Sequence, residues 1–294
     1  MSVKHVGIVS VLFASLMWSV EPVFAKLSYQ NSDFLHTSMV RAVFVTLVAL
    51  IYVVITNKAD FRISRKQFPP LLYVAIVGTV FADLMYFFAL TQVPVVNAVV
   101  IGHLQPVFIV LMGYVLLRGD RLSRFDYLGV LFMILSGLLV STKTVENFMS
   151  LKFGSMGDLF VLFATVAWAT TTIAARKYLR EVNAGVITFY RFLVASVFFT
   201  FYLVFFSYVS VSSVYQVLVG VVVGVGTILY YEGLKRIKAA QVSAVELSTP
   251  FFAAILGFVV LGEGVTLLQV GGFFLLLIGM YLSLIHISEP TRPY

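Results

Sequence analysis

The chain has 294 residues, of which 61% are hydrophobic and 11% are charged, and its formal net charge is +7. A water-soluble domain carries about 25% charged residues, so this composition excludes a soluble fold and indicates a polytopic membrane protein. Because cysteine is absent, disulfides, thiol catalysis and cysteine-ligated metals are excluded. We expect no cofactor and no metal. The basic residues lie between apolar segments, which indicates cytoplasmic loops and not nucleic acid binding.

Ten apolar segments approach or exceed the length needed to cross a bilayer, which is about 20 residues. In chain order they are 7–27, 35–56, 68–90, 95–117, 126–142, 156–178, 185–206, 214–234, 240–261 and 267 onward. The expected fold class is an all-α polytopic membrane protein with ten transmembrane helices. Fourteen Lys and Arg residues fall on the side of the N-terminus and three on the other side. The positive-inside rule then predicts a multi-pass protein of the plasma membrane with both termini in the cytoplasm.

The two halves of the sequence repeat each other. At an offset of 150 positions (168 − 18 = 150), the matches are Trp18 with Trp168, Lys26 with Arg176, and Arg41 with Arg191. At an offset of 144 positions (230 − 86 = 144), the matches are Tyr86 with Tyr230 and Pro106 with Pro250. Since each half has five spans, an odd number, the second half must enter the membrane from the opposite side. We predict two inverted five-helix repeats, at 1–145 and 154–281.

The last segment of the chain, LSLIHISEPTRPY at 282–294, resembles the translation of a sequencing-library adapter. The sequence therefore predicts a non-native tail at 282–294, with the native sequence lost after about Tyr281. We expect no functional role for the charged and imidazole side chains of this tail.

Glycine spacing predicts where helices pack closely. Gly220 stands four residues before Gly224, and Gly271 stands eight before Gly279. Small residues at intervals of one or two helical turns let two helix backbones approach each other. We therefore predict packing seams along these two helices.

Several motifs of the chain occur in a known group of carriers. In the first half they are Trp18, Lys26, Arg41, Ala89–Leu90 and Pro106, and in the second Trp168, Arg176, Arg191, Gly233–Leu234, Pro250 and the run LGEGVTLLQVGG at 261–272. With these residues, the chain resembles the EamA-type two-repeat branch of the drug/metabolite transporter superfamily. The resemblance implies a carrier, in many members an exporter, that moves small organic solutes by alternating exposure of a central cavity between the repeats. It does not choose a substrate.

Ionisable groups inside apolar spans cost about 2.5–3.5 kcal/mol each on insertion scales, so each one needs an explanation. At a rise of 1.5 Å per residue, Glu21, Arg41, Asp83 and His103 all lie roughly 9–12 Å inside the outer ends of their spans. Pro22, which follows Glu21, lacks an N–H and predicts a bend or interruption of the first span. We predict a substrate-binding set that consists of Trp18, Glu21, Asp83, His103, Trp168 and Glu246.

Arg41 and Arg191 are expected to be structural charges that pair with embedded acids. For Glu21, a direct role in binding substrate or protons and a purely structural pairing with Arg41 are both open. For Glu246, a position facing the cavity and a pairing with Arg191 are equally open. Embedded acids outnumber embedded bases, which favours amines, zwitterions or protons over anions.

The leading hypothesis is a secondary-active carrier, an exporter of small polar or amphipathic metabolites such as amino acids or amines, with proton coupling as one option. An exchanger of organophosphates or nucleotide sugars is the alternative within the same class. A membrane enzyme or a non-transporting scaffold is the alternative from another class, and the scattered positions of His5, His36 and His103 disfavour a metalloenzyme. The expected partners are a small-molecule substrate and the lipid bilayer. The chain itself is expected to be a monomer or a homodimer.

Overall fold

The structure of the chain is a computed structural model. It describes residues 3–56, 60–105, 107–109, 112, 124–150, 154–179, 181–236, 245–246 and 248–285, and within these ranges every regular element is a helix. The predicted all-helical fold class is thereby confirmed. Pro106, residues 118–123 and the tail residues 286–294 lie outside the described residues, as do parts of the predicted spans 95–117 and 240–261.

Most of the helices lie on the predicted apolar segments. They are α1 (Val3–Ser28), α2 (Phe34–Thr56), α3 (Phe68–Tyr73), η1 (Val74–Asp83), α4 (Leu84–Leu90), α5 (Val95–Gly102), α7 (Arg124–Thr142), α8 (Val145–Met149), α9 (Met156–Tyr178), α10 (Ala184–Phe206), α11 (Val214–Arg236), α13 (Ser248–Leu261) and α14 (Leu267–Ile285). Among the described residues, six stretches are long and apolar enough to cross a membrane: His5–Ser28, Phe34–Thr56, Phe68–Leu90, Met156–Ala175, Ala184–Phe206 and Val214–Arg236. Shorter apolar helices cover Val95–Ile109, Tyr127–Val140, Ser248–Leu261 and Leu267–Gly279.

Side-chain caps fix where three of the long helices begin. Asp33 accepts the backbone N–H of His36 at the start of α2. Ser155 and Asp158 form a reciprocal capping box at the start of α9, in which each side chain accepts the backbone N–H of the other residue. Asn183 caps α10 through its side-chain oxygen. These polar residues satisfy backbone donors that a helix leaves without partners in its first turn.

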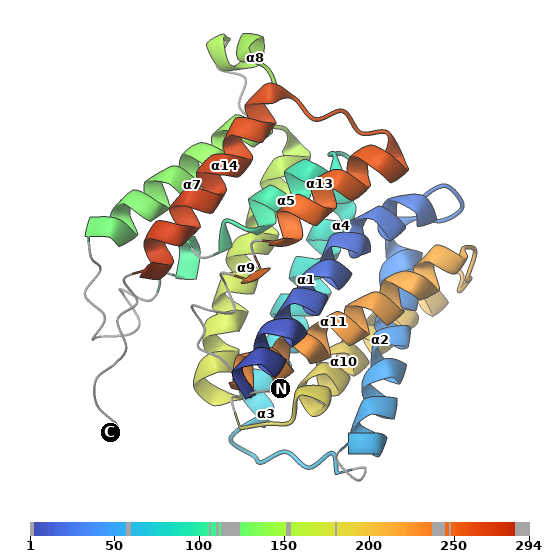
Figure 1. The fold of residues 1–294 in the computed structure, drawn as a ribbon. Coiled ribbons are helices and arrows are strands. Elements are labelled where there is room, and N and C mark those ends of the chain that lie inside the picture. Colours follow the sequence, from blue (N-terminus) through green and yellow to red (C-terminus); the bar gives the residue numbers. More distant parts are fainter. Residues whose placement is uncertain are drawn as a thin grey trace.

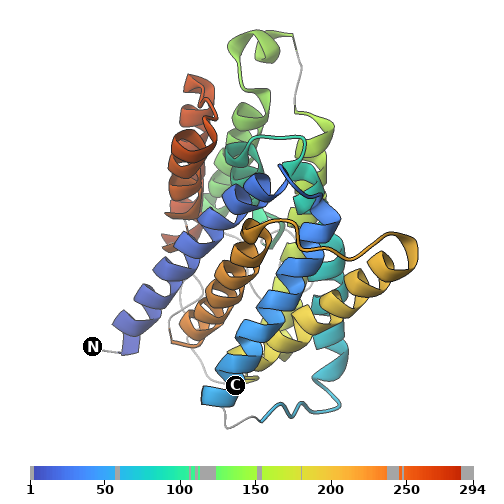
Figure 2. The same ribbon diagram turned by 90° about the vertical axis from the view of Figure 1, so that its right-hand side faces the viewer.

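Helices from the two halves interleave in the bundle. α1 packs along α11, and α2 packs against both α10 and α11. α7 and α14 form a second pair along one flank, as Figure 1 shows. In Figure 2 this α7–α14 pair lies apart from α2 and α10, on the other side of the bundle. The central helices therefore have neighbours from both halves of the chain.

Glycines bring α11 and α2 into close contact. A Cβ atom at Gly220 would lie 2.9 Å from the carbonyl oxygen of Arg41, and one at Gly224 would lie 2.9 Å from the Cβ atom of Val48. No side chain fits at these separations, so glycine sets the distance between the two helices. The seam lies directly beside Arg41.

A second glycine seam joins α14 to α7. A Cβ atom at Gly279 would lie 2.7 Å from the carbonyl oxygen of Gly129, and Gly272 makes a similar approach to α7. Gly271 has no neighbouring heavy atom within 4 Å of a Cβ position. The prediction that Gly271 lies in this seam is therefore wrong by one residue, because Gly272 is the residue that faces α7.

Two spans contain irregular backbone. Between α3 and α4, η1 is a π-helix of 10 residues that ends at Asp83; such segments are rare and often occur at functional sites. α5 ends at Gly102, and His103 and Leu104 form a turn, where the sequence predicted an unbroken span. α1, by contrast, runs through Pro22 without interruption. The interruption expected beside Glu21 is therefore absent from α1.

Candidate functional site

A cavity of about 250 Å³ lies in the bundle between the two halves of the chain. Its lining includes all of the embedded residues that the sequence analysis selected, namely Trp18, Glu21, Arg41, Asp83, His103, Trp168, Arg191 and Glu246. They come from α1, α2, the π-helical span and the turn after α5 in the first half, and from α9, α10 and the stretch before α13 in the second. A space of this size suits a small metabolite and lies just below the range of drug-sized sites.

The cavity extends toward one end of the bundle. Its lining reaches Val74, where η1 begins, and Ala175 and Leu234, near the ends of α9 and α11. This is the end at which α1 begins, because a Cβ atom at Gly233, near the end of α11, would lie 3.1 Å from the carbonyl oxygen of Gly7, near the start of α1. We call this end the mouth of the cavity.

Asp83 is the centre of the charged network. Its Oδ2 atom accepts a hydrogen bond from Nη1 of Arg41 at 2.9 Å. Its Oδ1 atom accepts a hydrogen bond from the indole Nε1–H of Trp168 at 2.8 Å and lies 3.6 Å from Nη2 of Arg191. The carboxylate is 3% exposed, so these donors replace the water that a buried anion loses.

Arg41 bridges two embedded acids of the first half, Glu21 and Asp83. Its second terminal nitrogen lies 3.0 Å from Oε1 of Glu21, and its guanidinium stacks over the rings of Phe87 and Phe192, at 4.8 and 5.2 Å. The Nε atom of Arg41 is buried and has no hydrogen-bond partner among the described residues. One cation therefore serves two carboxylates inside an apolar wall.

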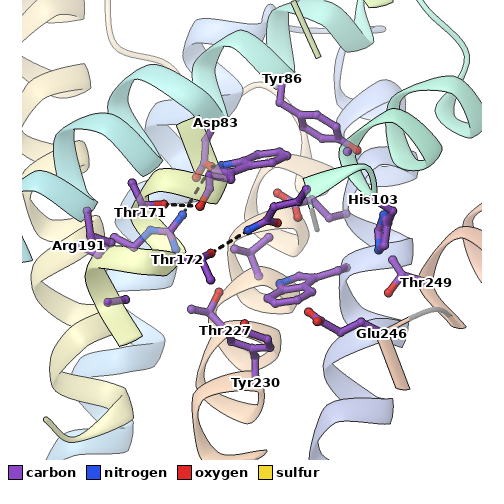
Figure 3. A pocket seen from close by; sticks show the side chains of 18 of the residues that line it. Asp83, Tyr86, His103, Thr171, Thr172, Arg191, Thr227, Tyr230, Glu246 and Thr249 are labelled. Atoms are coloured by element: carbon purple, nitrogen blue, oxygen red, sulfur yellow. Dashed lines mark hydrogen bonds and ion pairs between the residues drawn. The ribbon is translucent and has the colours of Figure 1, made fainter. Parts of the chain in front are cut away.

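Arg191 approaches the same acid from the second half. It donates from Nε to the hydroxyl of Thr79 in η1 and faces Asp83, as Figure 3 shows. The contact with Asp83 is an ion pair at 3.6 Å, which is longer than a hydrogen bond. The two repeated arginines, Arg41 and Arg191, thus meet at one carboxylate.

The π-helix explains part of this geometry. Trp168 donates its single N–H to Asp83 and also to the carbonyl oxygen of Gly78 at 3.1 Å. Gly78 lies in the middle of η1, where the backbone hydrogen bonds span five residues and not the four of an α-helix. Thr171 of α9 packs against Gly78, 3.3 Å from the position of a Cβ atom. Close approach of α9 to η1 therefore positions Trp168 beside Asp83.

The aromatic lining is arranged as two crossed pairs. Trp18 of the first half packs on Tyr230 of the second, with ring centroids 5.1 Å apart. Trp168 of the second half packs on Tyr86 of the first at 5.3 Å. These are the same residues that match in the sequence repeat, so each tryptophan contacts the tyrosine of the other half. The cavity wall consequently has an approximate internal symmetry.

The opposite wall holds His103, Glu246 and Thr249, which Figure 3 places near one another. Nδ1 of His103 lies 2.7 Å from the carbonyl oxygen of Val99. A carbonyl only accepts, so Nδ1 carries a hydrogen, and Nε2 is the acceptor of the neutral ring. The hydroxyl of Thr249 is buried without a hydrogen-bond partner among the described residues. This wall offers polar atoms that a bound solute can satisfy.

Some lining residues were missing from the sequence prediction. Gln105 donates to the hydroxyl of Thr172 at 2.7 Å, and Thr171 and Thr227 complete the polar wall. A signal for them was present, because Thr171 and Thr172 belong to a run of three threonines within an apolar span. Gln105 also stands immediately before a proline. These side chains are uncharged, so a selection based on ionisable groups did not include them.

A model of the EamA-like transporter family matches residues 5–142 and 155–285 of the chain. The chain belongs to the EamA-like transporter family. It is 30% identical over 239 residues to an uncharacterized transporter of Synechocystis, covering 76% of this chain and 67% of that protein. It is 26% identical over 190 residues to the pseudopaline exporter CntI of Pseudomonas aeruginosa, covering 65% of this chain and 63% of that protein.

A solved crystal structure shares the fold with a TM-score of 0.67 at 19% identity, covering 94% of this chain and 96% of the other. The match to the family model confirms the resemblance seen in the sequence. EamA-family membership makes the chain a multi-pass membrane transporter and not an enzyme. Its partners accordingly include a small-molecule substrate and the lipid bilayer.

Proposed function

We propose that this EamA-family protein is a secondary-active carrier that exports a small zwitterionic or amine-bearing metabolite, such as an amino acid. The substrate binds in the central cavity, which is exposed alternately to the two sides of the membrane. The charge balance of the cavity is the observation that supports this class most directly. Three acids, Glu21, Asp83 and Glu246, line it together with two arginines, and both arginines already contact a carboxylate.

An ammonium group fits this environment better than an anion. The excess carboxylate attracts a cation, and the crossed tryptophan–tyrosine pairs offer ring faces for cation–π contact. An anionic organophosphate, in contrast, needs guanidinium groups that are free to bind it. Arg41 is held by Glu21 and Asp83, so phosphate binding would leave buried acids without their partner. The organophosphate alternative is therefore disfavoured.

The direction of transport and the driving force belong to the same proposal. Export is supported by the relative in Pseudomonas aeruginosa, which is named an exporter. Proton coupling is supported by the sharing of one arginine between two acids. Protonation of Glu21 would leave Arg41 bound to Asp83 alone, so a proton and an ammonium group would compete for the Glu21 carboxylate. Such competition is what an exchanger of protons for substrate requires.

A ligand screen tests the substrate class. Purified protein is heated with amino acids, polyamines or sugar phosphates, because a ligand that binds the native state raises the apparent stability. We expect amino acids or polyamines to raise the melting temperature and to support counterflow in proteoliposomes. Stabilisation and counterflow by sugar phosphates alone would reject the proposal in favour of an organophosphate exchanger.

The membrane topology of the proposed carrier has ten spans, in two inverted five-helix repeats, with both termini in the cytoplasm. The crossed aromatic pairs support the inverted arrangement, and the distribution of basic residues supports the orientation. The expected result is that an impermeant thiol reagent labels Glu146→Cys but not Arg65→Cys in intact cells. Both positions are exposed, and the chain has no cysteine of its own. Labelling of Arg65→Cys alone would reverse the orientation.

A further inference from the structure

A three-part contact joins the two halves at the end of the bundle opposite the mouth. Nζ of Lys26, in the last turn of α1, lies 2.7 Å from Oε1 of Glu263, in the connection from α13 to α14. The other oxygen of Glu263 accepts the backbone N–H of Val95, the first residue of α5, at 2.7 Å. One carboxylate from the second half therefore holds two helices of the first half.

The local backbone positions Glu263 for this contact. Gly262 has φ of +67°, a left-handed conformation that favours glycine, and it follows directly after α13. The N–H of Glu263 then donates to the carbonyl oxygen of Gly257 at 3.1 Å. A Cβ atom at Gly257 would lie 3.2 Å from Oε2 of Glu263, so the small residue also makes room for the carboxylate.

The N–H of Val95 is a suitable anchor for the carboxylate. It lies in the first turn of α5, where backbone donors have no acceptor within the helix. Two residues further, the buried Asn97 donates to Asp158 of α9 and accepts from Gln269 of α14. These bonds tie α5 to both second-half helices. Glu263 is thus fixed from the α5 side, and Lys26 is the partner on a separate helix.

The ion pair is also accessible enough to be broken and re-formed. The side chains of Lys26 and Glu263 are 21% and 15% exposed, whereas Asn97 and Gln269 are 0% and 2% exposed. A partly hydrated pair loses less on separation than a buried one, because water solvates both charges as they part. The buried amide contacts are the lasting joint at this end, and the lysine pair is the part that can open.

We propose that the Lys26–Glu263 ion pair is the latch that closes the cavity at the end opposite its mouth, and that it opens once in every transport cycle. The proposal rests on the alternating exposure of the cavity proposed above. It assigns to Lys26 the role of the moving partner, to Glu263 that of the fixed partner, and to the Val95 amide that of the anchor. With the latch intact, solutes reach the cavity from the mouth.

Labelling of a cysteine in the cavity tests this latch without a known substrate. Thr227→Cys places one thiol in the cavity lining of a chain that has no other cysteine. An impermeant thiol reagent is applied to intact cells and, separately, to inside-out vesicles. We expect Lys26→Gln to raise the labelling rate of Thr227→Cys from the latch side, the side of the membrane opposite the mouth. The expected increase is about fivefold, the effect of losing a partly exposed ion pair. Labelling from the mouth side should fall.

A second variant and a matched control complete the experiment. Glu263→Gln keeps an acceptor for the N–H of Val95 and should reproduce the Lys26→Gln phenotype. The two variants therefore test the same ion pair, and one can stand in for the other if it accumulates poorly. Exchange of the two charges, Lys26→Glu with Glu263→Lys, should bring the rate back toward that of the parent. Glu232→Gln is the control, because this acid is 16% exposed and forms its ion pairs with Lys235 and Arg236 of its own helix. It should leave labelling from both sides unchanged.

The outcomes separate the latch from the proposed function. Unchanged labelling of Thr227→Cys from both sides in the Lys26 and Glu263 variants would overturn the latch, whatever the protein transports. An effect of Glu232→Gln equal to that of Glu263→Gln would also overturn it, because the loss of any paired acid would then suffice. Equal labelling from both sides in the parent would instead remove the alternating exposure on which the carrier proposal depends.

Discussion

Replacement of Arg41 by glutamine is expected to cause the largest loss of folded protein, about 3–5 kcal/mol, because it removes one partner of a buried ion network. Glu21 and Asp83 would then remain in an apolar environment without their shared cation. Arg191 could not replace it, since it lies 3.6 Å from Asp83 and already donates to Thr79. The measurement is the thermal unfolding midpoint of purified protein, together with the folded yield.

Two further variants make the Arg41 result specific. Arg62→Gln removes an arginine whose side chain is 95% exposed and should leave the midpoint unchanged. Arg41→Gln combined with Glu21→Gln should recover part of the loss, because the uncompensated charge is then smaller. A midpoint for Arg41→Gln within experimental error of the parent would show that the network contributes nothing to folding.

Replacement of Glu21 by glutamine is expected to have the largest effect on transport while the protein still folds. The amide has nearly the same shape and can still accept a hydrogen bond from Arg41, which the acid binds at 3.0 Å. It cannot carry the negative charge or exchange a proton. A hydrogen bond to a charged group contributes about 1.5–3 kcal/mol, so we expect a loss of roughly 10- to 100-fold in transport rate or in substrate affinity.

The pH profile distinguishes the two roles that remain open for Glu21. Transport by reconstituted protein is measured across a range of pH in the parent and in Glu21→Gln. A flat profile in the variant would assign proton coupling to this carboxylate, and a retained profile with weaker binding would assign substrate recognition. Glu232→Gln, a paired acid outside the cavity lining, should behave as the parent does. A parental rate and a parental profile in Glu21→Gln would reduce Glu21 to a structural partner of Arg41.

The sequence was sufficient for several of the long helices because each of these is encoded locally. The predicted segments 68–90 and 156–178 coincide with the helical stretches Phe68–Leu90 and Met156–Tyr178, since continuous apolar composition and a capping box specify where such helices run. The charges that gather around Asp83 could also be selected from the sequence. An ionisable group is costly in a membrane, and the rise of 1.5 Å per residue along each predicted span indicates which positions share a level.

Two of the remaining features, the π-helix and the pairing of Lys26 with Glu263, depend on contacts between distant segments. The π-helix before Asp83 leaves no compositional mark, and it fits the approach of Trp168 from α9. The turn at His103 has a local cause in the sequence. Pro106 lacks the backbone N–H that would donate to the carbonyl oxygen of Gly102 in an unbroken helix. The pairing of Lys26 with Glu263 joins residues 237 positions apart, and no local pattern specifies such a partner.

The glycine seam between α11 and α2 has a consequence for ion leakage. At Gly220 the backbone of α11 reaches the carbonyl group of Arg41 so closely that even a methyl group would collide. A file of water molecules therefore has no space between these two helices at the level of the charged network. A membrane potential does work on every charge that crosses it, and a hydrated crevice beside Arg41 would let protons dissipate that energy. By setting two backbones in contact, a residue without a side chain insulates the buried charged network around Arg41.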